Sequence, residues 1–261
     1  MTEGVDQPVS NEAPVKTKKP NEAVELVKTV VYALLIALVL RVLLFQPFTI
    51  PSASMEPTLL VGDYIIVSKY TYGWSKHSIP FSPPLFSGRI LERQPHRGDV
   101  VVFKLPRDGS TDYIKRLVGL PGDRIQVTDG LLYVNGKAVP RSEMSPETVE
   151  SVFGAPRSIQ RYRNTMGDHT FTTYSLDPSS DVENTGVFVV PAGHFFMMGD
   201  NRDNSLDSRY PEETGVGFVP AENLVGRAEV ILLSWKEGAS LFKPWTWVMD
   251  ARVNRFARRI E

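Results

Sequence analysis

The longest apolar run of the chain lies near its beginning, between Thr29 and Phe45, and its only charged residue is Arg41. Each Leu, Ile, Val or Phe of such a run favours membrane insertion by about 0.3–0.6 kcal/mol. An Arg opposes insertion by about 2.5–3.5 kcal/mol at the centre of the membrane, and by less near an end. The apolar side chains outweigh Arg41. The pattern therefore predicts a transmembrane helix over 24–46, preceded by a disordered polar tail over 1–23.

The basic residues around this run predict its orientation. Those before it are Lys16, Lys18, Lys19 and Lys28. After Arg41, no Lys or Arg appears until Lys69. Positive charge collects on the cytoplasmic side, so we expect a cytoplasmic tail and an extracytoplasmic body over 47–261. Two alternatives are the buried helix of a soluble protein and a cleavable signal peptide, since Ser52-Ala53-Ser54 is a small-x-small pattern downstream of an apolar run.

Beyond residue 46 the hydrophobic pattern becomes that of short strands. The β-branched or apolar runs are 64–67, 100–103, 124–127, 131–134 and 227–233. Asp129-Gly130 and Asn135-Gly136 follow two of these runs and are strong hairpin signals. The pattern predicts a mainly β body of coiled antiparallel sheet. The stretches 73–97 and 140–185 are rich in Pro, Ser, Thr and charge, and we expect loops or a less regular extension there.

Composition narrows the possible chemistry. The net charge is −1, so no basic field indicates binding to nucleic acid. The chain has no Cys, which excludes thiol nucleophiles and disulfides. The four His residues are scattered, without a His-Glu-x-x-His motif. Asp203, Ser205 and Asp207 alternate like the start of a calcium loop, but Ser208 stands where that loop needs Gly. We therefore expect no metal and no cofactor.

Serine remains as a candidate nucleophile. Gly-x-Ser-x-Gly is absent, which excludes the α/β-hydrolase turn. His194 follows Pro191-Ala192-Gly193 in a strand-like run and is more typical of a packed strand residue, although a Ser-His-Asp triad remains an alternative. Three segments stand apart from ordinary strand-and-turn sequence: 51–59 (PSASMEPTL), 112–123 (DYIKRLVGLPGD) and 199–210 (GDNRDNSLDSRY).

In this order and after one apolar span, the three segments resemble bacterial signal peptidase I. Gly62-Asp63-Tyr64 and the stretch 97–103 match the remaining segments of that family, and the resemblance covers 48–134 and 195–230. One departure is the stretch 211–216, which intervenes before Gly217-Phe218-Val219-Pro220 and places Val216 where the family has Trp. We expect this insertion to alter the loop beside the site.

The resemblance implies a Ser-Lys dyad, with Ser54 as nucleophile and Lys115 as general base. It implies that Ser205 orients the Lys amine, and that the Ser54 N–H and the Ser52 hydroxyl stabilise the oxyanion. The implied ion-pair residues are Arg116, Asp200, Asp207 and Arg209. The residues implied to line two shallow apolar pockets for small substrate side chains are Phe48, Ile50, Leu59, Ile65, Tyr113 and Ile114.

The chemistry of lysine fits this role only after a shift of its pKa. An unperturbed Lys, with a pKa of about 10.4, is almost fully protonated at neutral pH and cannot accept the serine proton. Burial disfavours the ammonium form and lowers the pKa. Tyr113-Ile114 and Leu117-Val118 are apolar neighbours of Lys115 in sequence. An exposed edge strand with a solvated Lys115 is the structural alternative.

The expected function is removal of signal peptides from exported preproteins after Ala-x-Ala-like sequences, at the outer surface of the bacterial inner membrane. Signal peptides and membrane lipid are the expected partners. One alternative is another kind of Ser-Lys peptidase, acting on pilus subunits or in the mitochondrial inner membrane. A second is a membrane-tethered β-domain that only binds exported chains. Self-cleaving repressors are related Ser-Lys proteins, but they lack a membrane span, so the apolar run 29–45 argues against them. We also expect an amphipathic interfacial helix over 244–260, with Trp245, Met249 and Phe256 on one face. A tail packed on the β body is the alternative.

Overall fold

The structure is a computed structural model that describes residues 21–150, 156–176, 180–236 and 245–261. The chain divides into an N-terminal unit, residues 1–38, and a body, residues 39–261, each of which is described by itself. Most of the tail predicted for 1–23 lies outside the described residues.

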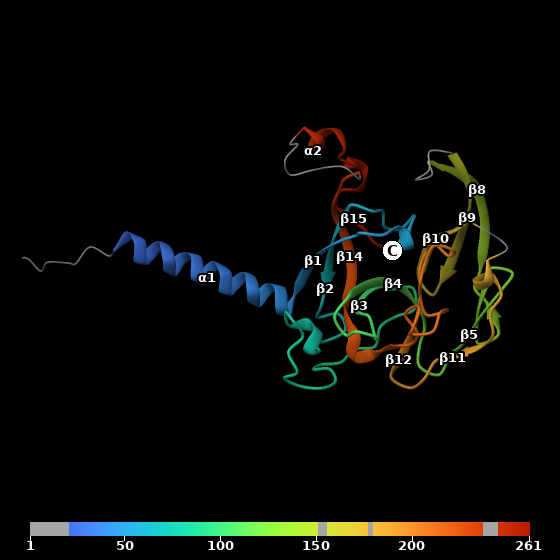
Figure 1. Cartoon of the computed structure of the whole chain (residues 1–261), viewed down its shortest axis with the longest axis horizontal. Coiled ribbons are helices and arrows are strands. Elements are labelled where there is room, and N and C mark those ends of the chain that lie inside the picture. The colour runs from blue at the N-terminus through green and yellow to red at the C-terminus, as the bar shows by residue number, and fades with distance from the viewer. Residues whose placement is uncertain (1–20, 151–155, 177–179, 237–244) are drawn as a thin grey trace, which may run out of the picture. The chain divides into compact units, whose positions relative to one another are not determined.

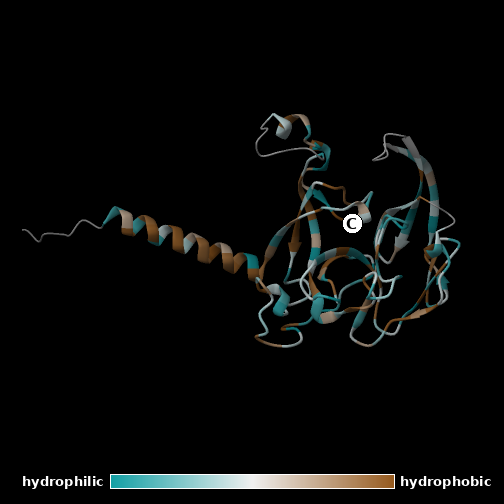
Figure 2. Ribbon diagram, viewed as in Figure 1, coloured by the Kyte–Doolittle hydropathy of each residue, from teal (hydrophilic) through white to brown (hydrophobic). Residues whose placement is uncertain are grey.

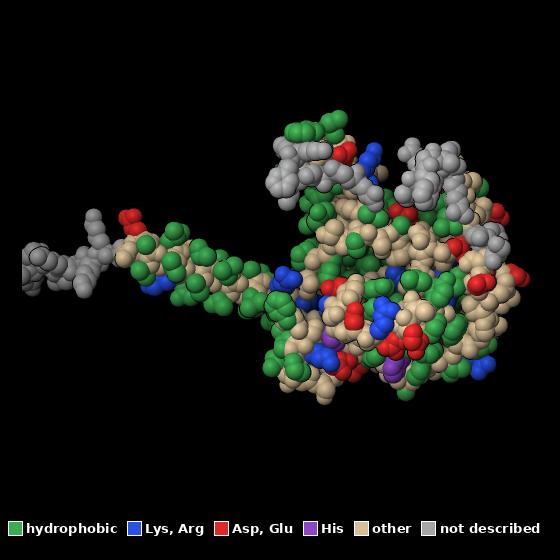
Figure 3. All heavy atoms as spheres, in the orientation of Figure 1, with side chains coloured by type: hydrophobic (Ala, Val, Ile, Leu, Met, Phe, Trp, Pro, Cys, Tyr) green, Lys and Arg blue, Asp and Glu red, His purple; other side chains and the backbone are tan. Residues whose placement is uncertain are grey.

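Helix α1 spans Glu22–Leu43, and none of its side chains is buried. Its 22 residues give a length of about 33 Å at 1.5 Å per residue, which matches a hydrocarbon core of about 30 Å. Apolar residues cover it along its length (Figures 2 and 3). Within the described residues it is the one helix long and apolar enough to cross a membrane. The helix ends three residues before the predicted end at 46, because strand β1 begins at Phe45.

An antiparallel eight-stranded sheet forms the centre of the described body, in the order β1-β2-β14-β3-β4-β12-β13, with β15 paired to β14. Its strands are β1 (Phe45–Thr49), β2 (Asp63–Ser68), β3 (Val100–Lys104), β4 (Asp112–Gly119), β12 (His194–Met198), β13 (Val219–Pro220), β14 (Leu224–Ser234) and β15 (Arg258–Arg259). The long strand β14 runs beside both β2 and β3 (Figure 1). The predicted mainly β fold is confirmed.

Two smaller antiparallel sheets complete the body. One has the order β11-β5-β6-β7, with β5 (Arg124–Thr128), β6 (Leu131–Val134), β7 (Lys137–Ala138) and β11 (Phe188–Val189). The other has the order β10-β9-β8, with β8 (Arg141–Glu150), β9 (Pro156–Met166) and β10 (His169–Ser175). Both lie on the side of the body opposite β1 and β2 (Figure 1).

The hydrophobic pattern explains how the central strands are placed. Val100, Val101 and Val102 of β3 are all buried, as a strand needs when it lies between two neighbours and is covered on both faces. In β2, Ile65 and Val67 are buried while Tyr64 is exposed, the alternation of a half-covered strand. The main core cluster is formed by Ile65 and Val67 of β2 and by Val100 and Val102 of β3, together with Met55 and Leu59 from the segment after β1.

Two predictions of local structure are wrong. The described part of 140–185 is more regular than expected, because β8, β9 and β10 form an antiparallel sheet, with one register shift between Met144 and Glu147, and Phe171 is buried in a core cluster. The single helix expected over 244–260 does not form. Helix α2 covers only Thr246–Met249 and is followed by a 3₁₀ turn at Val253–Arg255 and by β15.

The reason for the break after α2 is an ion pair with the body. Arg255 is buried and donates to both carboxylate oxygens of Asp63, at 3.1 and 2.5 Å. The next residues pair with β14, where Val230 faces Arg259. Tertiary contacts of the basic residues thus override the helical spacing of the apolar ones. Trp245, Val248 and Met249 of the segment around α2 remain exposed.

Candidate active site

Ser54 and Lys115 come from two elements that the core holds side by side. Ser54 lies in the 3₁₀ turn η1 (Ala53–Met55), which Met55 anchors in the core with no exposed surface. Lys115 lies on β4, opposite Val101 of β3. The distance from Lys115 Nζ to Ser54 Oγ is 2.7 Å, and Nζ also donates to the Ile114 carbonyl at 3.0 Å. The predicted pair therefore meets at hydrogen-bond distance, and the solvated edge strand is wrong.

Burial lowers the pKa of Lys115. Lys115 is 3% exposed, and its Nζ lies 5.4 Å from the centre of the Tyr113 ring. Burial lowers its pKa to about 8, although the negative charges of Asp207 and Asp200 partly oppose this change. A lysine with this pKa is unprotonated in about one molecule in ten at pH 7. A serine hydroxyl and a partly neutral amine at this distance have the arrangement of a nucleophile with its base.

Ser54 and Lys115 both line a cleft of about 510 Å³. Residues lining this cleft are Pro51, Ser52, Ser54, Thr111, Asp112, Tyr113, Ile114, Lys115, Asp203, Asn204, Ser205, Leu206 and Tyr210. Ser52 is exposed, and its Oγ lies 3.4 Å from Ser54 Oγ. As the second residue of η1, Ser54 has an N–H without an acceptor inside the turn. The Ser52 hydroxyl and the Ser54 N–H thus both lie beside Ser54 Oγ.

Two buried ion pairs hold the polar segment 199–210 in place. Arg116 donates to both carboxylate oxygens of Asp200, at 2.8 and 2.7 Å, and its other nitrogen donates to the Gly98 carbonyl at 2.6 Å. Arg209 similarly donates to both oxygens of Asp207, at 2.9 and 2.8 Å. All four predicted ion-pair residues therefore form pairs.

Asp207 links its pair to the backbone beside the dyad. Its Oδ2 accepts the Gly199 N–H at 2.9 Å. Burial by itself would raise the pKa of Asp207, but Arg209 and these hydrogen bonds outweigh burial and hold the pKa below its usual value. The carboxylate is therefore ionised at neutral pH, beside the positively charged guanidinium of Arg209.

Ser205 lies in the same cleft as Lys115, but the predicted orienting hydrogen bond is not formed. Its Oγ is buried and has no hydrogen-bond partner among the described residues. Gly199 lies against it, since a Cβ atom at Gly199 would stand 2.3 Å from Ser205 Oγ and 2.5 Å from the Ser54 carbonyl oxygen. The space between Ser205 and Ser54 therefore requires glycine at 199.

The predicted pocket residues divide into two groups. Tyr113 and Ile114 line the cleft. Ile50, Leu59 and Ile65 are buried in the main core cluster, and Phe48 packs against that cluster without lining the cleft. Whether substrate side chains reach any of these residues stays a prediction.

The alternative catalytic groups are not at this site. His194 Nδ1 lies 2.9 Å from the Ala192 carbonyl oxygen, and His194 does not line the cleft. No group of three potential metal-ligating side chains occurs among the residues that the structure describes.

The insertion over 211–216 closes on itself beside Asp207. Gly215 donates its N–H to the Pro211 carbonyl at 2.7 Å, and Val216 donates to the Asp207 carbonyl at 3.3 Å. Val216 is fully buried in a core cluster with Phe195 and Met197. Val216, which stands where the family has Trp, is thus packed in the core, and the Asp207–Arg209 pair still forms.

Sequence reasoning did not single out Asn201 and Thr58. Asn201 Nδ2 donates to the Ala53 carbonyl at 3.1 Å, and Thr58 Oγ1 donates to Asp200 at 2.5 Å. Both residues stand inside the quoted motifs, but the motifs alone do not reveal which atoms their side chains contact.

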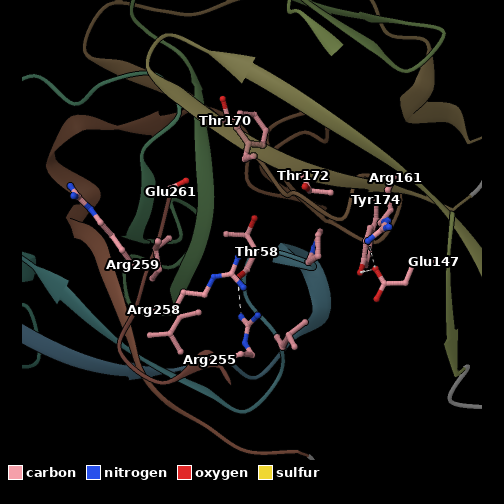
Figure 4. Close-up of a pocket in the computed structure, with 15 residues that line it drawn as sticks. Thr58, Glu147, Arg161, Thr170, Thr172, Tyr174, Arg255, Arg258, Arg259 and Glu261 are labelled. Carbon is pink, nitrogen blue, oxygen red and sulfur yellow. Dashed lines mark hydrogen bonds and ion pairs between the residues drawn. The ribbon is translucent and has the colours of Figure 1, made fainter. Parts of the chain in front are cut away.

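A second cavity, of about 540 Å³, lies apart from the dyad. Thr58, Arg255 and Arg258 are on one side of it and β10, with Tyr174, on the other (Figure 4). Neither Ser54 nor Lys115 lines this cavity.

Known proteins resemble the chain over most of its length. The model of the family "Signal peptidase, peptidase S26" matches residues 23–235. Signal peptidase I of Rickettsia typhi is 42% identical over 247 residues, covering 88% of this chain and 90% of the relative. Signal peptidase I of Rickettsia massiliae is 40% identical over 248 residues, with the same coverage. A crystal structure of a signal peptidase I from Enterococcus faecalis is 28% identical, with a TM-score of 0.30, and covers 52% of this chain and 97% of that one. By the family match and these relatives, the chain belongs to the signal peptidase family, peptidase S26.

Proposed function

We propose that this protein is a membrane-bound serine endopeptidase that removes signal peptides from exported preproteins after Ala-x-Ala-like sites. Ser54 is its nucleophile and Lys115 its general base. The observation that carries this proposal is the 2.7 Å distance between Lys115 Nζ and Ser54 Oγ, at a lysine that is 3% exposed. The family membership supports the substrate class.

The first chemical step follows from this distance. The neutral Lys115 amine accepts the Ser54 hydroxyl proton while Oγ bonds to the scissile carbonyl carbon. The carbonyl oxygen becomes an oxyanion, which the Ser54 N–H and the Ser52 hydroxyl stabilise. The Lys115 ammonium then gives its proton to the leaving amine as the C–N bond breaks, and an acyl ester on Ser54 remains. Lys115 is neutral again.

The second step hydrolyses the ester by the same groups. Lys115 accepts a proton from water as the water oxygen attacks the ester carbon. It returns this proton to Ser54 Oγ when the C–O bond breaks, which releases the acid product and restores the enzyme. Neither step needs a metal or cofactor in this scheme.

Helix α1 supports a membrane location in which the tail is cytoplasmic and the body extracytoplasmic. The lysines before the span and their scarcity after it favour this orientation over the reverse. The exposed apolar side chains Val248 and Met249 are candidates for contact with lipid. The active site would then meet the cleavage site of a substrate whose own apolar segment lies in the membrane.

A direct test uses the purified full-length protein and a preprotein whose signal peptide ends in Ala-x-Ala, with mass analysis of the products. The wild-type protein should cut once after that sequence, whereas Ser54→Ala should not cut. Ser142→Ala, at an exposed serine of β8, is the matched control and should cut normally. A protein that only binds exported chains would yield no cleavage product with any variant.

A further inference from the structure

Asn201 fixes the backbone that carries the nucleophile. Its main-chain N–H donates to the Ser54 carbonyl at 3.1 Å, and its side-chain Nδ2 donates to the Ala53 carbonyl at 3.1 Å. Asn201 is 3% exposed, so water does not readily replace these hydrogen bonds. Two consecutive carbonyl groups of the turn at Ser54 are therefore tied to one residue, which restricts rotation of this turn and hence movement of Ser54 Oγ.

Asn201 is itself held by strand β10. Tyr174 donates its N–H to the Asp200 carbonyl at 2.9 Å and accepts the Arg202 N–H at 3.0 Å, so that Tyr174 and Asn201 face each other in a parallel bridge. A series of hydrogen bonds thus runs from β10 through residues 200–202 to Ser54. It connects the small sheet β8–β10 to the nucleophile.

The small sheet is held together around Tyr174. The Tyr174 hydroxyl donates to Glu147 of β8 at 3.0 Å, and Arg161 of β9 donates to the same carboxylate oxygen at 3.0 Å. Figure 4 shows the three side chains meeting beside the second cavity. All three strands therefore share one polar contact at the point where β10 meets the segment 200–202.

We propose that Asn201 is a positioning residue for Ser54, and that the sheet β8–β10 braces Asn201 through the backbone of Tyr174. This inference rests on the proposed role of Ser54 as nucleophile. It assigns a purpose to the extension over 140–185. Asn201 does not line the cleft, so it acts through the placement of Ser54 and not through substrate contact.

The expected effect is on the rate of reaction more than on substrate binding. A displacement of a reacting group by about 1 Å can lower a rate by about 100-fold. Asn201→Ala removes the side-chain bond to Ala53 and keeps the main-chain bond to Ser54. We expect kcat to fall by about 10- to 100-fold, with KM changed by less than about twofold. Asn201→Asp has a similar volume but cannot donate when ionised, and should lose at least as much.

The brace is tested separately at Tyr174. Tyr174→Pro removes the N–H that bonds Asp200, whereas Tyr174→Ala removes the same ring and keeps that N–H. Thr172→Pro is a matched proline control, because residues 172 and 174 have the same parity in β10 and turn their N–H groups away from β9. We expect kcat to fall by about tenfold or more in Tyr174→Pro, and by clearly less in Tyr174→Ala and Thr172→Pro.

The experiment measures kcat, KM, the pH dependence of kcat and the thermal unfolding midpoint of the full-length variants, with Ser54→Ala in parallel. Asn201→Ala should keep the pH midpoint of the wild-type protein, because Asn201 carries no charge, and its kcat should stay low after correction for the folded fraction. If Ser54→Ala is inactive but Asn201→Ala keeps kcat within about threefold, or recovers it after that correction, the positioning role is overturned. An active Ser54→Ala protein would instead refute the proposed function.

Discussion

Arg116 and Asp200 form a buried ion pair with two hydrogen bonds, at 2.8 and 2.7 Å, one residue after Lys115 and one residue before Asn201. Each side chain is 1% exposed. The pair therefore joins strand β4, which carries Lys115, to the segment whose Asn201 contacts the turn at Ser54. Its charges are desolvated, so the loss of one partner leaves the other without compensation.

We expect Arg116→Met and Asp200→Asn each to lower the free energy of unfolding by about 3–5 kcal/mol, because each variant leaves one buried group unpaired. Chemical unfolding followed by tyrosine and tryptophan fluorescence measures the change. Arg124→Met, at an exposed arginine of β5, is the control and should stay within about 0.5 kcal/mol of the wild-type value. Equal stability of all three variants would refute a structural role for the pair.

Gly199 should not tolerate a side chain. In Gly199→Ala, the new Cβ would approach Ser205 Oγ to 2.3 Å and the Ser54 carbonyl oxygen to 2.5 Å, so one of them must move. We expect kcat to fall by about 100-fold because Ser54 is displaced. Gly186→Ala is the control, since nothing lies within 4 Å of its added Cβ. Normal cleavage by Gly199→Ala would show that the two segments are not packed this closely.

The Asp207–Arg209 pair predicts how stability depends on acid pH. The folded-state pKa of Asp207 is lowered below its usual value of 3.8. Its contribution to the free energy of unfolding is therefore present above about pH 4 and is lost as the pH falls through the folded pKa. Unfolding of wild type and Asp207→Asn, measured from pH 6 down to pH 2, should show a difference that shrinks below about pH 4. A difference that grows with acidity would contradict this sign.

Much of the fold could be predicted because its central strands carry simple patterns. The continuous apolar run 100–103 became β3, and the two Gly-containing turns became the hairpins at Asp129-Gly130 and Asn135-Gly136. The strands β8–β10 were harder, because their polar and charged residues obscure the alternation of a two-sided sheet. The helical spacing at 245–260 misled for another reason. Arg255 pairs with Asp63, 192 positions earlier in the chain, and no local pattern records such a contact.

At the candidate site, too, some features could be predicted from the sequence and others could not. Ser54 and Lys115 are 61 positions apart, and only the resemblance of the segments around them indicated that they meet. The resemblance also implied that Lys115 is buried, and its exposed fraction of 3% confirms this. The two bonds from Asn201 could not be predicted, since a polar run such as 199–205 offers many groups for each acceptor.

Replacement of Ser205 should impair cleavage less than replacement of Lys115. Its Oγ is buried without a hydrogen-bond partner among the described residues, so Ser205→Ala removes no hydrogen bond that the structure forms. We expect Ser205→Ala to change stability by less than about 1 kcal/mol. Its kcat should fall less than that of Lys115→Met, because the base remains. Cleavage assays and thermal unfolding of both variants measure this order, and the reverse order in kcat would contradict the assignment of Lys115 as the base.

If neutral Lys115 takes the Ser54 proton, the rate of preprotein cleavage must follow the deprotonation of Lys115 as the pH changes. The pKa of Lys115 is lowered to about 8, so the wild-type rate should rise with pH through about 8 and stay high at mildly alkaline pH. Lys115→Arg should be inactive at every pH, because a guanidinium does not lose its proton in proteins. His194→Ala should keep the wild-type profile. An active Lys115→Arg protein, or a rise centred near pH 6.5 that disappears in His194→Ala, would show that Lys115 is not the base.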